Sequence, residues 1–248
     1  MCHFELTNPV SGGSGISLEE VSLAGEGVEL PCFLARSPQA NASAVLIIHD
    51  VTGASPFYRD LALRLAGEGF TALLPEYFVR QGPPADGSRE AIMARASMLD
   101  EPTTLNDMAH TMKWLQDEVS EQVGIVGFCM GGTLALLAAG REPLPAASVA
   151  YYGFPRGRQG WPHIPMDEVA NLRSPVLAFW GDQDHGVGMD NVAAWESATS
   201  AAGKDVEIVM YPGLPHGFLT FDPDSPNYSG AQDSWQRTLT FLREHLRQ

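Results

Sequence analysis

The sequence is poor in cysteine, and what it has is irregularly placed. Three cysteines, Cys2, Cys32 and Cys129, occur in 248 residues. An odd count without regular spacing is not the pattern of a disulfide framework, and reduced thiols are typical of the cytoplasm. The N-terminal segment, residues 1–13, has no basic start followed by an apolar core, so we expect no signal peptide and a cytoplasmic protein.

Basic residues and long apolar runs are also scarce. Fifteen lysines and arginines face 30 acidic residues, which gives a formal net charge of −15. Such a surface repels phosphate backbones and anionic lipid, so we expect neither nucleic-acid nor membrane partners. No apolar run is long enough to span a bilayer. The expected partner is a small-molecule substrate, bound by a monomer or a small homo-oligomer.

Cofactor motifs are missing as well. No Cys or His pair stands at metal-ligand spacing, no Gly-Lys-Ser/Thr ending marks a P-loop, and the Rossmann pattern G-x-G-x-x-G is absent. We therefore expect no metal and no cofactor.

What is present is a regular alternation of strands and helices. Hydrophobic residues make up 44% of the chain, and its length suits a single α/β domain over residues 1–248. An antiparallel hairpin is predicted from Glu19–Leu23 and Val28–Leu34. The further strands are predicted at Ala44–Ile48, Phe70–Leu74, Val123–Gly127, Ala147–Tyr151, Val176–Trp180 and Val206–Tyr211. The helices are predicted at Tyr58–Gly67, Thr104–Val119, Gly131–Ala139, Asn191–Ala202 and Ala231–Leu246. This order predicts a mostly parallel sheet with helices on both faces.

One segment carries the pattern of a catalytic turn. Gly127-Phe-Cys129-Met-Gly131 is a G-x-C-x-G sequence between a predicted strand and a predicted helix. A sharp strand-to-helix turn forces its central residue into a strained conformation and leaves room only for very small side chains two residues before and after it. It presents the nucleophile above the sheet, while the following helix favours a thiolate. The alternatives are a buried structural cysteine and a phosphate-binding loop, and the flanking strand and helix favour the catalytic turn.

An acid and a histidine follow in the chain order that this geometry needs. Asp182 and Asp184 come after the strand at 176–180, and His216 comes after the strand at 206–211. These loops lie at the carboxyl ends of parallel strands, where ligands bind in open α/β sheets. The other histidines are expected to be solvated: His3, His110, His163 and His245. His185 is expected to be a structural neighbour of Asp184.

Together these motifs resemble the dienelactone hydrolase (carboxymethylenebutenolidase-like) family, which has the α/β-hydrolase fold. The resemblance runs from the strand at 44–48 to the C-terminus, and its motifs are Gly127-Phe-Cys-Met-Gly-Gly132, Tyr151-Tyr-Gly153, Gly181-Asp-Gln-Asp-His185 and His216-Gly-Phe218. It implies a Cys129, Asp184 and His216 triad, with Asp184 rather than Asp182 as the acid.

The resemblance also implies roles around the triad. The family acid after the first buried strand, usually glutamate, falls on Asp50, where it would help to govern the thiol proton. The oxyanion hole would be the N–H groups of Val51 and Met130. The substrate contacts would come from Arg80, Tyr152, Phe218 and Thr220, with Arg80 matching an arginine that binds the substrate carboxylate.

Two positions depart from the family pattern. The second carboxylate-binding arginine, four residues after the histidine, is Thr220, and Asp50 is one methylene shorter than glutamate. Arginine offers two parallel donors to a carboxylate, whereas threonine offers one neutral hydroxyl. A neutral or differently charged substrate is therefore as good a candidate as dienelactone.

The functional prediction is a hydrolase that cleaves a small activated ester or enol lactone through a cysteine thioester. The alternatives are a broad-specificity carboxylesterase of the same fold, a non-catalytic small-molecule-binding protein, and a thiol redox protein. The redox alternative would need a C-x-x-C pair or a nearby resolving cysteine. The ordered Cys, Asp and His set argues against a protein that only binds.

Overall fold

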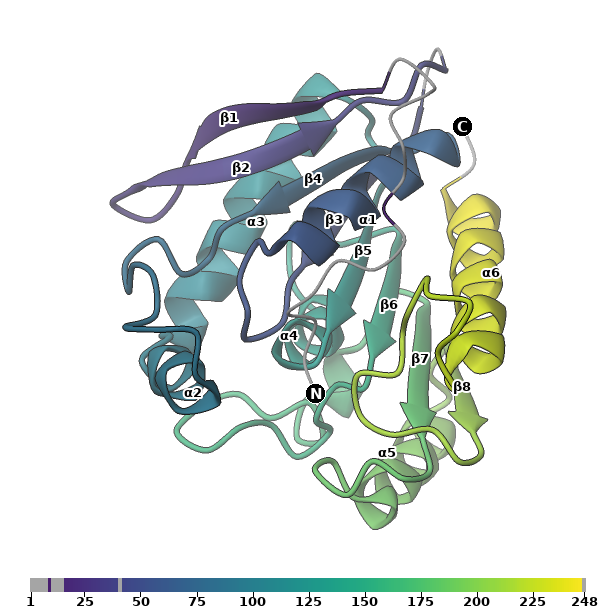
Figure 1. The fold of residues 1–248 in the computed structure, drawn as a ribbon. Coiled ribbons are helices and arrows are strands. Elements are labelled where there is room, and N and C mark those ends of the chain that lie inside the picture. The colour runs from purple at the N-terminus through teal and green to yellow at the C-terminus, as the bar shows by residue number, and fades with distance from the viewer. Residues whose placement is uncertain (1–8, 10–15, 40–41, 247–248) are drawn as a thin grey trace.

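A computed structural model describes residues 9, 16–39 and 42–246, and Figure 1 shows its fold. Cys2, His3 and most of the segment in which no signal peptide is expected lie outside the described residues. Within them, no helix is both long enough and apolar enough to cross a bilayer.

The centre of the molecule is one eight-stranded sheet in the order β1-β2-β4-β3-β5-β6-β7-β8. β1 and β2 form the predicted antiparallel hairpin, and β2 pairs antiparallel with β4. All remaining neighbours pair in parallel. The mostly parallel sheet with an antiparallel N-terminal hairpin is thus confirmed. The strands are β1 Leu18–Ala24, β2 Glu29–Ala35, β3 Ala44–Ile48, β4 Thr71–Pro75, β5 Val123–Phe128, β6 Ala147–Tyr151, β7 Val176–Gly181 and β8 Val206–Tyr211.

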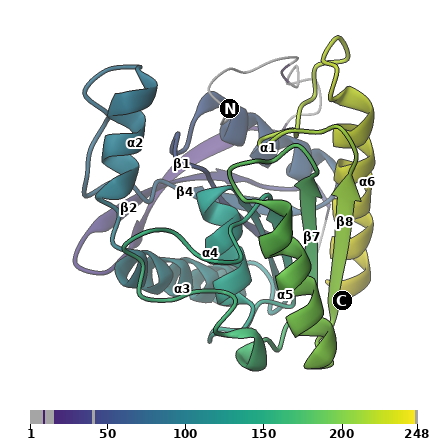
Figure 2. The ribbon, with the colours of Figure 1, turned by 90° about the horizontal axis from the view of Figure 1, so that it is seen from below.

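Helices cover both faces of this sheet. Figures 1 and 2 show α1 and α6 on one face and α3, α4 and α5 on the other. Because a parallel sheet is covered twice, its inner strands face apolar neighbours on both sides. Every residue of β3, β4, β5, β6 and β7 is accordingly buried. The helices are α1 Pro56–Gly67, α2 Arg89–Ser97, α3 Glu101–Glu118, α4 Met130–Ala138, α5 Met189–Ala201 and α6 Tyr228–His245, with a 3-10 turn at Val169–Asn171.

The sequence pattern predicted no element between Gly87 and Thr104, where the structure has α2 and the first turn of α3. α2 buries only Ile92, Arg95 and Ala96, so it lacks the apolar stripe that marks a helix in a sequence. Side-chain caps start both helices. Ser88 accepts the N–H of Ala91 at 3.2 Å, and Asp100 accepts the N–H of Thr103 at 3.0 Å.

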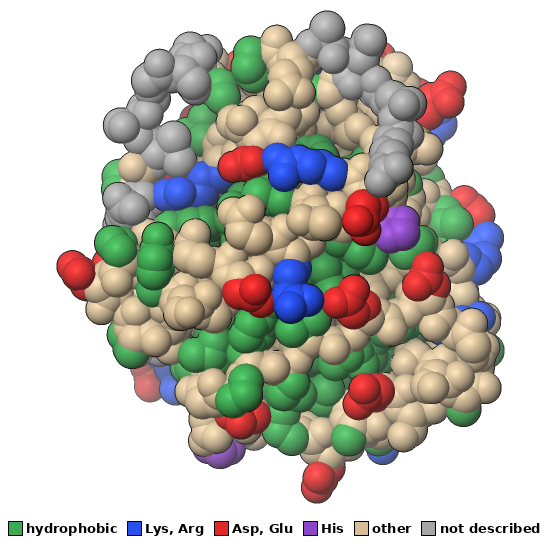
Figure 3. Space-filling view, turned by 90° about the vertical axis from the view of Figure 1, so that its right-hand side faces the viewer, with side chains coloured by type: hydrophobic (Ala, Val, Ile, Leu, Met, Phe, Trp, Pro, Cys, Tyr) green, Lys and Arg blue, Asp and Glu red, His purple; other side chains and the backbone are tan. Residues whose placement is uncertain are grey.

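The edge strand β8 is only half buried, and α6 lies beside it. Figure 3 views this side of the molecule, where acidic and basic side chains alternate between apolar ones. Arg237 of α6 pairs with Asp233 at 2.8 Å and with Glu207 of β8 at 3.6 Å. Charged side chains along an edge strand discourage pairing with another chain.

Candidate active site

Cys129 occupies the turn between β5 and α4, and its backbone is strained. Its φ is 53° and its ψ is −111°, a combination that costs on the order of 1–3 kcal/mol and persists only where the surrounding structure enforces it. The Cys129 N–H donates to the Tyr151 carbonyl at 2.9 Å, and the Cys129 carbonyl accepts the Thr133 N–H at 3.0 Å. The strained strand-to-helix turn that the glycine pattern predicted is therefore present.

Glycine is required around this turn because other chain segments touch it. A Cβ on Gly127 would lie 2.1 Å from the carbonyl oxygen of Gly131. A Cβ on Gly131 would lie 2.2 Å from the carbonyl oxygen of Ile48 and 2.5 Å from that of His49. Both contacts are with backbone, which cannot move aside cheaply. The start of α4 therefore packs directly against the end of β3.

The Cys129 residue is 6% exposed. Its surroundings therefore cover it on most sides without sealing it from the surface. A side chain in such a position is largely shielded from bulk water.

His216 and Asp184 form a hydrogen-bonded pair at the carboxyl ends of β8 and β7. The Nδ1 of His216 lies 2.7 Å from Oδ2 of Asp184. The Asp184 side chain is fully buried, and its Oδ1 accepts the N–H groups of Gly186 and Val187 at 3.1 Å each. A buried carboxylate that accepts from Nδ1–H leaves the proton-accepting lone pair of the neutral imidazole on Nε2.

Asp182, the other acid considered in this loop, has a different task. Its Oδ1 accepts the N–H of Gly213 at 2.7 Å and the side-chain amide of Gln183 at 2.9 Å. Asp182 thus ties the loop after β7 to the loop after β8, while Asp184 contacts the histidine.

Aromatic rings hold the imidazole of His216 in place. The ring of Tyr152 lies 5.0 Å from that of His216, and the ring of Phe154 lies 5.7 Å from it. Tyr152 follows β6, the strand between those that carry Cys129 and Asp184, and its ring also lies 6.3 Å from that of Phe128. With a φ of 40°, Tyr152 is the other non-glycine residue with positive φ among those described. Two strained residues therefore lie side by side at this sheet edge.

Asp50 is buried in the loop after β3, the strand next to β5. Its Oδ1 accepts both the backbone N–H and the hydroxyl of Thr52, at 2.8 and 2.6 Å. Val51, the expected oxyanion donor, directly follows. Met130 is the first residue of α4, where N–H groups have no acceptor one turn earlier within the helix. Ile48 lies opposite Gly127 in the sheet, so the two expected donors come from neighbouring strand ends.

Sequence reasoning missed two residues that hold this loop. The buried His49 accepts the Tyr77 N–H on Nε2 at 3.1 Å, so its proton sits on Nδ1, 2.8 Å from the Asp50 carbonyl. Glu76 accepts the N–H of Ala54 at 2.9 Å. Glu76 follows β4 directly, so its position at the carboxyl end of a strand was the available signal.

Arg80, which the resemblance implies as a carboxylate-binding residue, forms an ion pair within the protein. Its Nη1 donates to Oδ2 of Asp107 at 2.6 Å, and its Nη2 donates to Oδ1 at 3.1 Å and to the Glu26 carbonyl at 2.6 Å. The Asp107 side chain is fully buried, and its hydrogen bonds raise the pKa of Arg80. These contacts tie α3 to the β1–β2 hairpin through Arg80. Its contact with a substrate carboxylate stays a prediction.

Phe218 and Thr220, two further expected substrate contacts, are engaged within the protein. Phe218 is fully buried and packs its ring against Tyr152 at 5.6 Å and Tyr211 at 5.3 Å. The hydroxyl of Thr220 accepts the N–H of Asp222 at 3.1 Å. Substrate contacts of Tyr152, Phe218 and Thr220 stay predictions.

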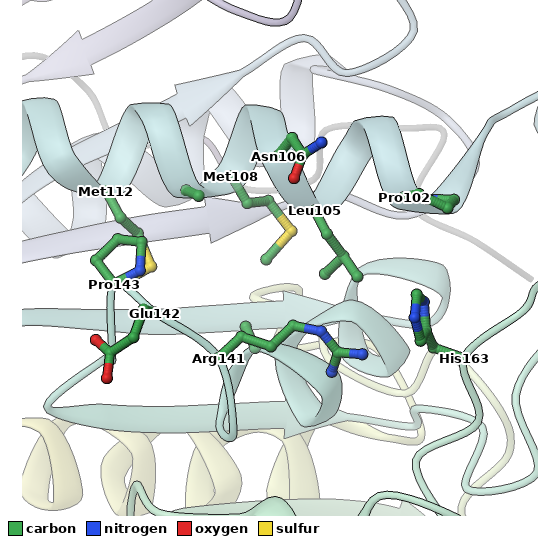
Figure 4. Close-up of a pocket in the computed structure, with 11 residues that line it drawn as sticks. Pro102, Leu105, Asn106, Met108, Met112, Arg141, Glu142, Pro143 and His163 are labelled. Atoms are coloured by element: carbon green, nitrogen blue, oxygen red, sulfur yellow. The ribbon is translucent and has the colours of Figure 1, made fainter.

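A separate hollow of about 150 Å³ lies between α3 and the segment after α4 (Figure 4). His163 lines it, and its Nδ1 lies 2.9 Å from Oε2 of Glu101, whose side chain is fully buried. His163 was expected to be solvated; its side chain is 41% exposed and also contacts Glu101. Cys129, Asp184 and His216 are not among the lining residues, which are Pro102, Leu105, Asn106, Met108, Ala109, Met112, Ala138, Arg141, Glu142, Pro143 and His163.

Across residues 16–39 and 42–246, no three His, Cys, Asp or Glu side chains cluster in a way that could hold a metal ion. The polar side chains at the carboxyl edge of the sheet are instead arranged in hydrogen-bonded pairs, such as His216 with Asp184. This arrangement suits proton transfer and orientation of side chains.

Comparison with protein families gives a match over most of the chain. The model of the dienelactone hydrolase family matches residues 30–246. A carboxymethylenebutenolidase from Rhodococcus opacus is 32% identical, over 99% of this chain and 98% of its own length. A Bradyrhizobium protein named "Probable 2-oxo-3-(5-oxofuran-2-ylidene)propanoate lactonase" is 30% identical, over 93% of this chain and 96% of its own length.

A solved structure supports the same relationship. The crystal structure of a "Putative Dienelactone Hydrolase" from Klebsiella pneumoniae superposes with a TM-score of 0.85 at 30% identity. The superposition covers 92% of this chain and 99% of the other. The predicted α/β-hydrolase fold is thereby confirmed.

Proposed function

Because the chain belongs to the dienelactone hydrolase family, we propose that this hydrolase cleaves a small activated ester or enol lactone through a thioester on Cys129. The observation that carries this proposal is the strained backbone of Cys129, at the sheet edge where His216 pairs with Asp184. Strain of this kind is retained mainly where function requires it. A cysteine that only fills space needs no such conformation.

Activation of the thiol is assigned to His216. Asp184 holds Nδ1–H, so Nε2 accepts the proton of Cys129. A free thiol has a pKa of about 8.5, so only a few per cent would be ionised at neutral pH without this help. The N-terminal end of α4 adds a positive potential that favours the thiolate. Asp50 assists by controlling when the Cys129 thiol loses its proton as substrate binds.

The thiolate attacks the substrate carbonyl carbon and forms the new C–S bond, while the carbonyl π electrons move to oxygen. The N–H groups of Val51 and Met130 stabilise that oxyanion. Loss of one such donor typically costs about 2.7–4 kcal/mol of transition-state stabilisation. When the C–O bond breaks, the alcohol or enol leaves with the proton that His216 carries. Water then attacks the thioester, gives its proton to His216, and releases the acid and the thiol.

The leaving group limits the substrate class. A thiolate departs from the tetrahedral intermediate more readily than an ordinary alkoxide does, so the intermediate reverts unless the alcohol is a good leaving group. Enol lactones, enol esters and aryl esters satisfy this condition. Amides and simple alkyl esters do not, and we propose that the enzyme turns them over poorly.

Residues 80 and 220 bear on the charge of the proposed substrate. Arg80 is occupied by the buried Asp107, and Thr220 stands where the resemblance implied a second arginine. Neither position offers the two free parallel donors that recognise a carboxylate strongly. We therefore propose a substrate that is neutral near these positions. This preference also favours the second candidate, a broad-specificity carboxylesterase of the same fold.

The nucleophilic role is tested with Cys129→Ala. Turnover of an aryl ester should fall by at least about 10³-fold, because the remaining oxyanion hole and binding contacts give only residual catalysis. Cys32→Ala is the matched control, since it removes another buried free cysteine, and it should leave turnover unchanged. Full activity of Cys129→Ala would refute the proposal.

The proposed location is the cytoplasm. Cys32 and Cys129, the free cysteines among the described residues, stay reduced in that compartment. A reduced Cys129 is also what the proposed attack requires. Fractionation of the native host should recover the protein with the cytoplasmic enzymes, and recovery from a secreted or periplasmic fraction would contradict this assignment.

A further inference from the structure

Arg95 is an arginine that the fold buries beside the proposed oxyanion hole. It lies in the last turn of α2 and is 8% exposed, while Met93 of the same helix is 41% exposed. Figure 2 shows α2 at the side of the molecule, away from α5 and α6. Arginine is rarely buried, because removing its charge from water is costly. A nearly buried arginine on a peripheral helix therefore needs a reason.

The contacts of Arg95 lead to the loop after β3. Its Nη2 donates to the carbonyl of Val51 at 2.9 Å. Its guanidinium carbon lies 4.1 Å from the centre of the Phe78 ring. Burial lowers the pKa of Arg95, while the carboxylates of Glu76 and Asp50 act in the opposite direction. Within the described part of the chain, its buried Nε has no hydrogen-bond partner.

The 50–54 loop is thus held by charged groups at several points. Arg95 binds the Val51 carbonyl, Asp50 binds the N–H of Thr52, and Glu76 binds the N–H of Ala54. These contacts fix the peptide groups on the C-terminal side of Val51. The direction of the Val51 N–H depends on the same short stretch of backbone. A donor stabilises an oxyanion only when it is already aimed at the place where the charge develops.

We propose that Arg95 is a positioning residue that holds the Val51 N–H in the geometry of the oxyanion hole. The inference rests on the proposed function, because it assumes that Val51 donates to the substrate oxyanion. Arg95 itself contacts the loop and not the reacting atoms. Its loss lowers the rate of the chemical step and leaves substrate binding nearly unchanged, since the misaligned donor matters most when the negative charge forms.

A purely structural role makes a different prediction. If Arg95 only fastened α2 to the body of the protein, its replacement would lower stability without a selective effect on kcat. The two roles are separated by a reaction of Cys129 that forms no oxyanion. Alkylation by iodoacetamide displaces iodide at a saturated carbon, so it reports the thiolate and its exposure but not the oxyanion hole.

The test compares Arg95→Met with Arg89→Met. Both variants remove one arginine from α2, and Arg89 is exposed. For Arg95→Met with an aryl ester, kcat should fall by about 10- to 100-fold, in the range expected for a misplaced catalytic contact. The KM and the alkylation rate of Cys129 should stay within about threefold. Arg89→Met should match the wild type in all three measurements.

Arg95→Lys keeps a positive charge and a donor, so its kcat should lie between those of Arg95→Met and the wild type. If Arg95→Met does not fold, Arg95→Lys decides alone. A kcat loss of about threefold or more at an unchanged alkylation rate then supports the inference, and an unchanged kcat overturns it. A parallel fall of kcat and alkylation rate in either folded variant also overturns it.

Failure of this inference is distinguishable from failure of the proposed function. If Cys129→Ala is inactive and Arg95→Met has wild-type kcat, only the role of Arg95 is refuted. If Cys129→Ala is active, the proposed function is refuted whatever Arg95 does.

Discussion

Two segments follow β5 and β4, the strands on either side of β3, at the same edge of the sheet, and they are held in different ways. The turn after β5, at Cys129, is fixed by backbone contacts that only glycine permits at positions 127 and 131. The segment after β4, residues 76–98, is fixed by charged side chains that reach distant parts of the chain. Arg80 pairs with Asp107, 27 residues away, and Arg95 binds Val51, 44 residues away.

Steric exclusion and charge pairing are thus two different ways of fixing the backbone around the candidate site. Steric exclusion at the turn after β5 sets the backbone of Cys129, the proposed nucleophile, and tolerates no added atom at the flanking glycines. Charge pairing in the 76–98 segment secures the surrounding loops and tolerates substitution at a graded energetic cost. Substitutions in the turn after β5 should therefore either leave the fold intact or disrupt it. Substitutions in the 76–98 segment should lower stability in proportion to the contact that is removed.

The largest expected effect comes from loss of the carboxylate that pairs with His216. Asp184→Asn should lower kcat for an aryl ester by about 10⁴-fold, because an amide cannot hold the imidazole tautomer that a carboxylate holds. Asp182→Asn is the matched control, since Asp182 binds the loop and not His216. Similar losses of kcat in the two variants would show that Asp184 has no special role.

The next effect concerns the turn itself. Gly131→Ala brings a methyl group to 2.2 Å from the carbonyl oxygen of Ile48, at the end of β3, and to 2.5 Å from that of His49. Overpacking against backbone should destabilise the fold by about 3 kcal/mol or more. Gly87→Ala, with nothing within 4 Å of the added carbon, should change the free energy of unfolding by less than about 0.5 kcal/mol. Urea denaturation measures both values, and equal stability of the two variants would contradict the steric account.

A smaller effect is expected in the 76–98 segment. Arg80→Met leaves the buried Asp107 without its cation and should lower the free energy of unfolding by about 2–4 kcal/mol, because an unpaired buried charge is costly. The KM for a carboxylated lactone should stay unchanged. A large rise in that KM with unchanged stability would restore the substrate-binding role that the resemblance implied for Arg80.

The smallest effect is expected at Thr220. Thr220→Arg adds a planar cation four residues after His216, so it should lower the KM for carboxylated lactones by a few-fold and leave the KM for neutral aryl esters unchanged. Steady-state kinetics on the two substrate classes gives the comparison. If acidic lactones gain nothing, the missing arginine does not explain the substrate preference.

The sequence predicted the parts of the molecule whose causes are local. Apolar runs marked the buried strands β3, β6 and β7 to within a residue, and glycine spacing marked the turn at Cys129. Chain order at the strand ends indicated His216 together with Asp182 and Asp184, and the family resemblance selected Asp184. Each of these signals lies within a few residues of the feature that it predicts.

The parts that could not be predicted depend on distant contacts. α2 has no apolar stripe, and its one buried charge is stabilised by Val51, Phe78 and nearby carboxylates from two other loops. The ion pair of Arg80 with Asp107 of α3 is another contact that the sequence did not predict. Which partner a long charged side chain takes is decided by tertiary structure, and sequence spacing does not report it.

The central claim is covalent catalysis by Cys129, and mass spectrometry of the acid-quenched enzyme tests it directly. On rapid mixing with an aryl ester, the peptide that contains Cys129 should gain the mass of one acyl group, in step with the first burst of phenol release. If the ester is turned over while the acyl group appears on another residue, or on none at any time, the thioester mechanism is wrong.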